Sequence, residues 1–123
     1  MPYRLALDGA ILRIALFGTL SAADMLLFAR ELSQIESDLP RIPDRIVDMS
    51  GVVATGFAFK LTMEIARRRR EQSFPNPFRS AIVAPSQDTA GFARIFQILS
   101  NNPQIEVKVF TTPAAAEAWL GVP

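Results

Sequence analysis

The chain has 123 residues, half of them apolar and 20% charged, with a formal net charge of +1, which fits one globular domain and excludes a disordered chain. The near-neutral charge gives no general attraction to nucleic acid or to a membrane surface. There is no Cys and no His, so disulfides, cysteine metal sites and histidine-dependent catalysis are excluded.

The first two predicted elements are strands over residues 3–7 and 11–17. Asp8 and Gly9 between them are a strong hairpin signal, because Asp-Gly suits the left-handed backbone of a two-residue turn. Gly18 is predicted to end the second strand. We therefore expect an antiparallel hairpin at the start of the chain.

A helix, a strand and a second helix are predicted next. Ser21 and Asp24 have the spacing of a capping box, so the first helix starts there and runs to about Ser37, with apolar residues at helical spacing. Residues 45–49 are predicted to form the third strand and residues 56–72 the second helix.

The rest of the chain continues the same alternation. Residues 80–84 are predicted to be a strand covered on both faces, because they are apolar without interruption. The segment 85–89, PSQDT, is predicted to open a helix that ends at 101–103, NNP. Residues 105–109 alternate apolar and charged, which indicates an edge strand. Thr112-Pro113 is predicted to open the last helix, as a cap followed by proline at the first helical position.

The predicted order is β-β-α-β-α-β-α-β-α, which is typical of an α/β protein. Strands that alternate with helices predict a five-stranded mixed sheet, mainly parallel, with an antiparallel first strand at one edge. Residues 1–123 contain no repeat and no domain boundary, so we expect a single domain. If the strands lie in sequence order, right-handed crossovers place the helices on one face. The other face then needs cover, and a second subunit in a homodimer would supply it.

The amino-terminal stretch MPYRLALDGA has no long apolar run and contains an acid at Asp8, so no signal peptide is expected. No apolar run approaches the roughly 20 residues that cross a bilayer. We expect a cytoplasmic protein without a membrane span, a metal site or a cofactor.

Three segments are predicted to lie at the carboxyl ends of the strands, where α/β sheets usually bind ligands: Ser50–Gly56, Pro85–Thr89 and Thr111–Pro113. Each places hydroxyl groups next to a helix start that could hold a phosphate or a carboxylate. Plain helix capping is the alternative for each segment. In the first segment, Gly51 is expected to allow a tight turn, and the helix is expected to begin within two residues of Thr55, the last good capping residue before the apolar stripe.

Asp48 ends the predicted third strand, a position that resembles the phospho-accepting Asp of receiver domains. Those domains need an acidic pair after the first parallel strand, where this chain has Thr19-Leu20-Ser21, and Lys108 lies within the fifth strand. We reject that interpretation. Asp48 is expected to accept hydrogen bonds from the loop that follows it.

Arg67, Arg68, Arg69 and Arg70 form the most conspicuous charge run. Consecutive residues point around a helix, and cations are stabilised at its carboxyl end, so a solvated helix end is the first interpretation. The alternative interpretation is that this run contacts an acidic partner. Nucleic-acid binding gains little support, because no other segment is comparably basic.

The stretches IVDMSGV, FRSAIVAPS and VFTTPAAAEAWL, with a leading hairpin and helix, resemble the STAS superfamily, named for sulfate transporters and anti-sigma-factor antagonists. The resemblance covers essentially the whole chain and is strongest to stand-alone bacterial members. It implies a small regulatory module that is not an enzyme and binds a protein partner, such as an anti-sigma factor or a kinase-like regulator.

In the antagonists of that family, a Ser at the head of the second helix is phosphorylated within an Asp-Ser-Ser-Gly context. The corresponding corner here reads Val53-Ala54-Thr55-Gly56, so Ala54 stands where the phospho-acceptor is expected and only Thr55 and Gly56 match. Ser50 belongs to the preceding DxSG and need not be equivalent. The usual phosphorylation switch is therefore not expected.

These observations favour a regulatory module that binds a protein partner through the head of the second helix. The candidate contact residues are Ser50, Thr55, Gly56 and Phe57, with Arg67–Arg70 as a secondary contact. The alternative is a domain that binds a small ligand or lipid, because α/β domains of the CRAL-TRIO type bind apolar ligands. This alternative is suggested by the phenylalanines predicted to lie in the second and third helices, Phe57, Phe59, Phe92 and Phe96.

Overall fold

The strands form one sheet in the order β1-β2-β3-β4-β5. The computed structural model describes residues 2–56 and 59–122. Its elements are β1 (Tyr3–Asp8), β2 (Ile11–Ser21), α1 (Ala22–Asp38), β3 (Asp44–Gly56), α2 (Phe59–Glu71), β4 (Phe78–Val83), α3 (Gln87–Leu99), β5 (Ile105–Phe110) and α4 (Pro113–Leu120). β1 runs antiparallel to β2, and the other neighbours pair in parallel. The predicted α/β fold and the edge position of the fifth strand are confirmed.

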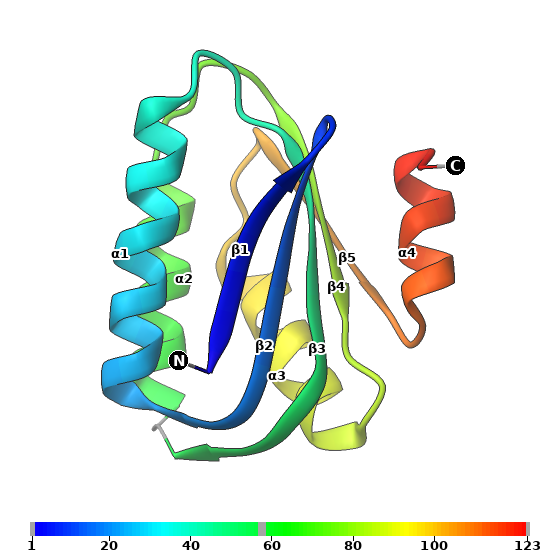
Figure 1. Cartoon of the computed structure of the whole chain (residues 1–123). Helices are drawn as coiled ribbons and strands as arrows, with labels where there is room; N and C mark the ends of the chain where they lie inside the picture. Colours follow the sequence, from blue (N-terminus) through cyan, green and yellow to red (C-terminus); the bar gives the residue numbers. More distant parts are fainter. Residues whose placement is uncertain (1, 57–58, 123) are drawn as a thin grey trace.

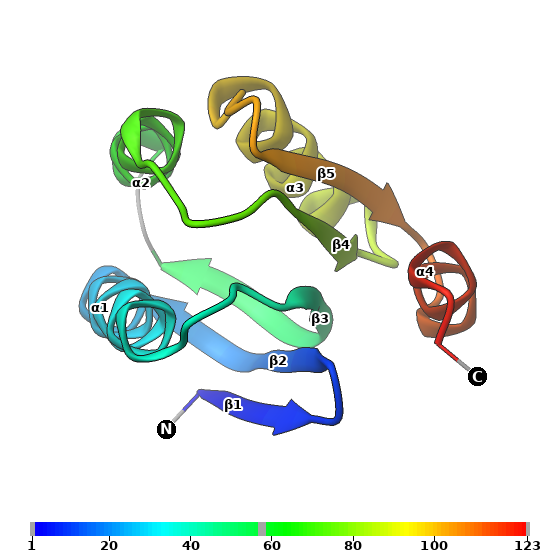
Figure 2. The same cartoon turned by 90° about the horizontal axis from the view of Figure 1, so that it is seen from above.

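The sheet separates two layers of helices. α1, α2 and α3 lie on one face and α4 lies on the other (Figures 1 and 2). The first three helices connect parallel strands, as the sequence predicted, whereas α4 follows the last strand and folds back over β3, β4 and β5. It buries the smaller of two apolar clusters, Ile46, Ala81, Val83, Ala116 and Leu120.

The larger core lies between the sheet and α1–α3. β2 supplies its centre, since Leu12, Ile14, Leu16 and Leu20 are each at most 4% exposed. Alternate residues of a strand point to the same face, so Leu12, Ile14 and Leu16 all reach this layer. Tyr3 of β1 continues it towards the edge and packs edge-on against Phe28 of α1.

The predicted caps are confirmed. The Ser21 hydroxyl accepts from the Asp24 N–H, and the Asp24 carboxylate accepts from the Ser21 N–H at 3.0 Å, which completes a capping box. The Thr112 hydroxyl accepts from the Ala115 N–H at the start of α4. Such caps are local, so the sequence is sufficient to predict them.

The predicted ends of the second and third strands are wrong. β2 continues through Gly18, whose φ of 72° is a left-handed conformation suited to glycine, and reaches Ser21. β3 runs to Gly56 instead of residue 49, and Gly56 pairs with Ser21. The carboxyl ends of β2 and β3 extend by pairing with each other. Neither sequence segment alone indicates this pairing.

The predicted tight turn at Gly51 and the predicted helix start near Thr55 are also wrong. Gly51 lies within β3, where a Cβ atom would come to 2.8 Å from the Phe17 Cβ of β2, so glycine permits a close strand approach. Thr55 and Gly56 are strand residues, and α2 is described from Phe59. The backbone of this corner is therefore an extended strand end.

Candidate functional site

The carboxyl end of β3 carries most of the residues that the sequence singled out. Ala15 pairs with Asp48 and Phe17 with Gly51, so one residue of β2 faces two of β3. A second register shift leaves Val53 as an extra residue, and its side chain is 81% exposed. Bulges of this kind re-aim side chains at the ends of strands.

Asp48 and Ser50 are hydrogen-bonded to each other within β3. The Asp48 Oδ1 accepts from the Ser50 backbone N–H at 2.9 Å and from its hydroxyl at 2.5 Å. Asp48 therefore accepts hydrogen bonds from a residue after it, as predicted, but Ser50 lies in β3 and not in a loop. The Ser50 hydroxyl proton is already donated to a carboxylate, and the residue itself is exposed.

The predicted contact residues do not all come together. Ser50, Thr55 and Gly56 lie along β3, and Phe57 lies outside the described residues. Arg67–Arg70 lie in the last turns of α2, at the end of the helix remote from Gly56. The two predicted surfaces are therefore separated by the length of α2.

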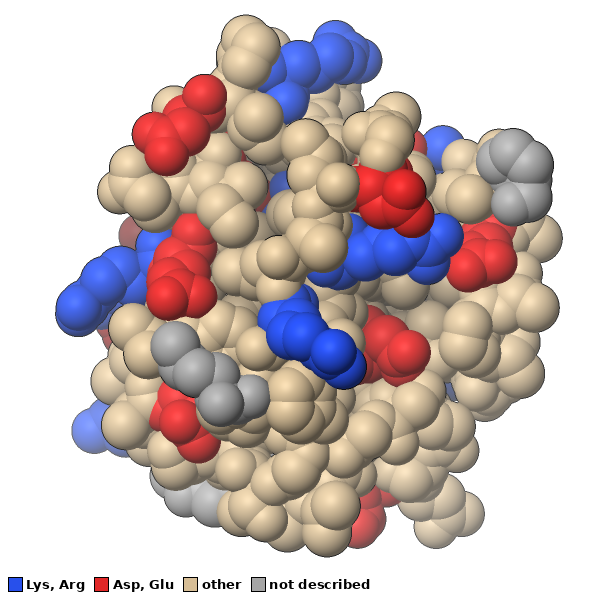
Figure 3. All heavy atoms as spheres, in the orientation of Figure 1, with Lys and Arg blue, Asp and Glu red and all other residues tan. Residues whose placement is uncertain are grey.

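Most of the arginine run is a solvated helix end, as predicted. Arg67 pairs with Glu64 at 2.8 Å and with Glu71 at 3.5 Å, and Arg68 approaches Glu64 at 3.6 Å. Figure 3 shows one face on which cations and anions are interspersed. Exposed pairs of this kind contribute little to stability.

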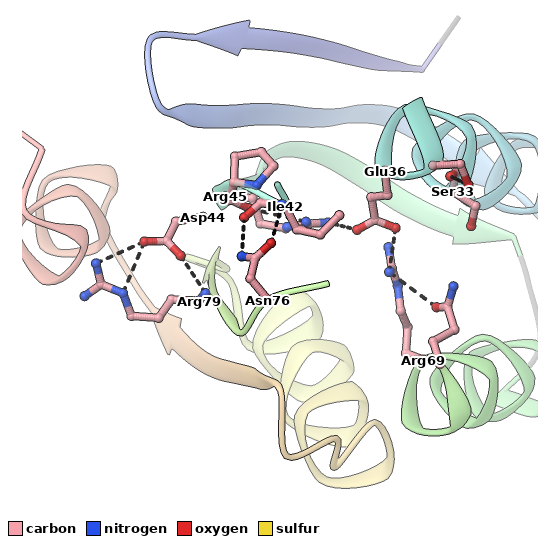
Figure 4. Close-up of polar contacts among 11 residues, drawn as sticks. Ser33, Glu36, Ile42, Asp44, Arg45, Arg69, Asn76 and Arg79 are labelled. Carbon is pink, nitrogen blue, oxygen red and sulfur yellow. Dashed lines mark hydrogen bonds and ion pairs between the residues drawn. The ribbon is translucent and has the colours of Figure 1, made fainter. Parts of the chain in front are cut away.

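Arg69 differs from its neighbours, because it turns inward. Its guanidinium binds Glu36 Oε1 of α1 at 2.8 Å, and Arg45 of β3 binds Glu36 Oε2 at 2.7 Å (Figure 4). The side chains of Glu36 and Arg45 are 5% and 3% exposed, and that of Arg69 is 12% exposed. These three residues, the buried triad, join α1, α2 and the sheet.

A cavity of about 890 Å³ lies beside the triad, between the sheet and α1–α3. Its inner wall is mainly apolar and includes Leu16, Leu20, Val47, Met49, Ile82 and Phe96. The exposed residues of its lining all belong to α1 and α2: Leu26, Arg30, Gln34, Ser37, Arg68 and Glu71. The cavity therefore opens to solvent between these two helices.

Three polar groups in the cavity wall have no hydrogen-bond partner among the described residues. They are Arg45 Nε, Thr62 Oγ1 and Ser100 Oγ, and all three residues are buried and line the cavity. Buried polar groups in native proteins are nearly always hydrogen-bonded. The cavity thus combines an apolar wall with a few unsatisfied polar groups, as small-molecule sites do.

Neither the triad nor the position of the cavity was predicted from the sequence. A signal for the triad existed, because strand alternation places Arg45 on the same face as Val47 and Met49, both in the larger core. Glu36 likewise lies one helical turn after the buried Leu32. Opposite charges on two predicted apolar faces indicate a buried ion pair.

Neither a metal-binding cluster nor a membrane-spanning helix is found in the described part of the chain. Among residues 2–56 and 59–122, no three or more acidic side chains gather in a way that could hold a metal ion. No helix within those residues is long and apolar enough to span a bilayer.

Comparisons with known proteins bear on the fold. No protein-family model and no curated protein sequence matches the chain. One solved structure similar to it is an uncharacterised protein of the DUF3478 family, with a SpoIIAA-like fold, from Shewanella loihica PV-4. The TM-score is 0.63 at 15% identity, over 96% of this chain and 91% of that one. The chain therefore has the SpoIIAA-like fold, which is the STAS-like fold that its sequence predicted.

Proposed function

We propose that this chain is a non-enzymatic module that binds a small apolar or amphipathic molecule in the cavity under α1 and α2. The cavity carries the proposal. Its volume of about 890 Å³ falls within the roughly 300–1,000 Å³ typical of small-molecule sites. It has an opening between two helices and a mainly apolar wall, which fits a ligand driven into it by the hydrophobic effect.

A cavity-filling variant tests this function. Ala93 of α3 is 3% exposed and lines the cavity. Ala93→Leu should fold, because its added methyl groups enter existing space, and it should bind an apolar fluorescent probe at least tenfold more weakly. The matched control is Ala118→Leu, since Ala118 is exposed on α4, on the other side of the sheet. Equal probe binding by both variants and the wild type would contradict a ligand site in this cavity.

A second function, partner binding at the carboxyl end of β3, is favoured by a separate observation. Val53 exposes 81% of its surface three residues after Ser50 in β3, so the strand end offers an apolar side chain to a partner. In this proposal the module is cytoplasmic and regulatory. Its partner, such as an anti-sigma factor or a kinase-like regulator, contacts Ser50, Thr55, Gly56 and Phe57, with Arg67–Arg70 as a secondary contact.

A charge introduced by mutation at the carboxyl end of β3 tests the partner contact. Thr55→Glu adds a fixed charge there and should abolish recovery of the partner in a pull-down while leaving the melting temperature unchanged. Thr111→Glu is the matched control, since Thr111 is exposed at the end of a different strand. Equal recovery with Thr55→Glu and with the wild type would move the contact surface elsewhere, with Arg67–Arg70 as the next candidate.

A further inference from the structure

The buried triad has an excess of positive charge. Arg45 and Arg69 share one carboxylate, that of Glu36. The acid next to Arg45 in the sequence, Asp44, is engaged elsewhere, since it pairs with Arg79 at 3.0 Å (Figure 4). Two guanidinium groups on one carboxylate leave one positive charge without a carboxylate partner inside the protein, although the Arg45 guanidinium lies over the Phe78 ring, 4.3 Å from its centroid. Buried charges are costly unless they are paired.

The hydrogen bonds of Arg45 show where a counter-ion fits. One terminal nitrogen donates to Glu36 Oε2 at 2.7 Å, and the other donates to the Pro43 carbonyl at 3.4 Å. Its Nε–H has no partner among the described residues, although the side chain is only 3% exposed. Arg45 lines the cavity, so an anion inside it can accept from this free N–H.

Two further features suit an anionic group here. The Ser100 hydroxyl, which can donate a hydrogen bond, also lines the cavity without a partner among the described residues. Burial lowers the pKa of Arg45 to about 10, so the guanidinium remains charged at neutral pH while its charge is poorly solvated.

We propose that the ligand of the cavity is an amphipathic anion, with its head group at the free Nε–H of Arg45 and its apolar chain along the inner wall. The inference rests on the proposed ligand-binding function and adds the chemical class of the ligand. The head group completes the charge balance of the triad. The chain lies against residues such as Leu16, Val47, Met49 and Phe96, which line the same cavity. A fatty carboxylate and an alkyl phosphate share this chemistry.

The experiment compares ligands with one tail and different heads. The whole protein, freed of bound lipid, is titrated by calorimetry with dodecanoate, dodecyl phosphate and dodecanol below their aggregation limits. We expect at least one of the two anions to bind tenfold or more tightly than dodecanol. The tighter of the two then identifies a carboxylate or a phosphate head group.

Variants locate the head group. Arg45→Met removes the excess charge and leaves the neutral pair of Glu36 and Arg69, so the preference for anions should vanish while dodecanol binds as before. Arg13→Met is the matched control, because Arg13 lies on the α4 side of the sheet and pairs with Glu117 at 3.2 Å; it should keep the full preference. If Arg45→Met fails to fold, Arg69→Met leaves the pair of Glu36 and Arg45 and should likewise reduce the preference.

The outcomes separate this inference from the function on which it rests. Equal affinity of the wild type for the anions and for dodecanol would overturn the anionic head group while leaving an apolar-ligand site in place. An unchanged anion preference in Arg45→Met would overturn the position of the head group. The absence of any binding by all three ligands would overturn the ligand-binding function itself.

Discussion

At the scale of single residues, the buried triad has the largest energetic consequences. Glu36 binds both Arg45 and Arg69 at distances below 3 Å, and at most 12% of any of the three side chains is exposed. Removing one partner of a buried ion pair is costly when it leaves a charge without compensation. The three residues therefore should not be equivalent to mutation.

Loss of Glu36 should be the most damaging change in the triad. Glu36→Gln leaves two buried guanidinium groups without an anion and should lower the free energy of unfolding by about 3–5 kcal/mol. Arg45→Met leaves a neutral Glu36–Arg69 pair and should cost clearly less. Urea unfolding of both variants measures the difference. Similar losses of unfolding free energy in the two variants would show that the excess positive charge does not destabilise the folded protein.

A second prediction at this scale concerns the unsatisfied Thr62 hydroxyl. Thr62 is 6% exposed, and its Oγ1 has no partner among the described residues. An unbonded buried hydroxyl costs about 1–3 kcal/mol, so Thr62→Val should stabilise the ligand-free protein by about 1 kcal/mol. The matched control is Thr89→Val, since the Thr89 hydroxyl hydrogen-bonds Ser86 in a cap, and that change should be destabilising. Thermal unfolding of lipid-free protein measures both, and destabilisation of the Thr62 variant would contradict the prediction.

At the scale of elements, the sequence was informative wherever a structure depends on local residues. The caps at Ser21 and Thr112 follow from the neighbouring residues, and both are confirmed. The carboxyl half of β3 is different, since its pairing depends on β2 and on two register shifts between the strands. Glycines in this region suggested turns, but Gly18 lies within β2 and Gly51 permits the close approach of Phe17.

Gly51→Ala should be destabilising because of that close approach. The new Cβ would lie 2.8 Å from the Phe17 Cβ, so the two strands must move apart. Overpacking of this kind costs about 1–3 kcal/mol. Gly91→Ala is the matched control, because Gly91 lies on α3 with no atom within 4 Å of the added Cβ; helix propensity should make that variant more stable by up to about 1 kcal/mol. Chemical unfolding compares the two, and a Gly51 variant as stable as the wild type would contradict the role of Gly51 in strand packing.

At the scale of the whole molecule, the alternation of strands and helices predicted a mainly parallel sheet with an antiparallel first strand. The strands lie in sequence order, and for that order right-handed crossovers place α1–α3 in one layer. The alternation did not predict that α4 covers the other face over β3–β5, because a helix after the last strand is free to fold to either side. α4 covers part of the sheet face that a second subunit was predicted to cover. The homodimer stays a prediction, which sedimentation at high protein concentration checks.

The cavity could not be predicted from the sequence for a related reason. The phenylalanines at positions 92 and 96 suggested an apolar ligand, and both line the cavity. The same residues also suit a filled core, however, and only the spacing of α1 and α2 over the sheet decides between the two. That spacing depends on side chains from α1–α3 and from the strands β2–β5, and on the triad that joins them.

Thermal unfolding of the lipid-free protein, with increasing dodecanoate, tests ligand binding in the cavity most directly. A ligand that binds only the folded state stabilises it by RT ln(1 + [L]/Kd). We expect the melting temperature of the wild type to rise steadily with dodecanoate concentration, and that of Ala93→Leu to rise clearly less at each concentration. A wild-type melting temperature that stays unchanged up to the aggregation limit of dodecanoate, or rises equally in Ala93→Leu, would contradict binding in this cavity.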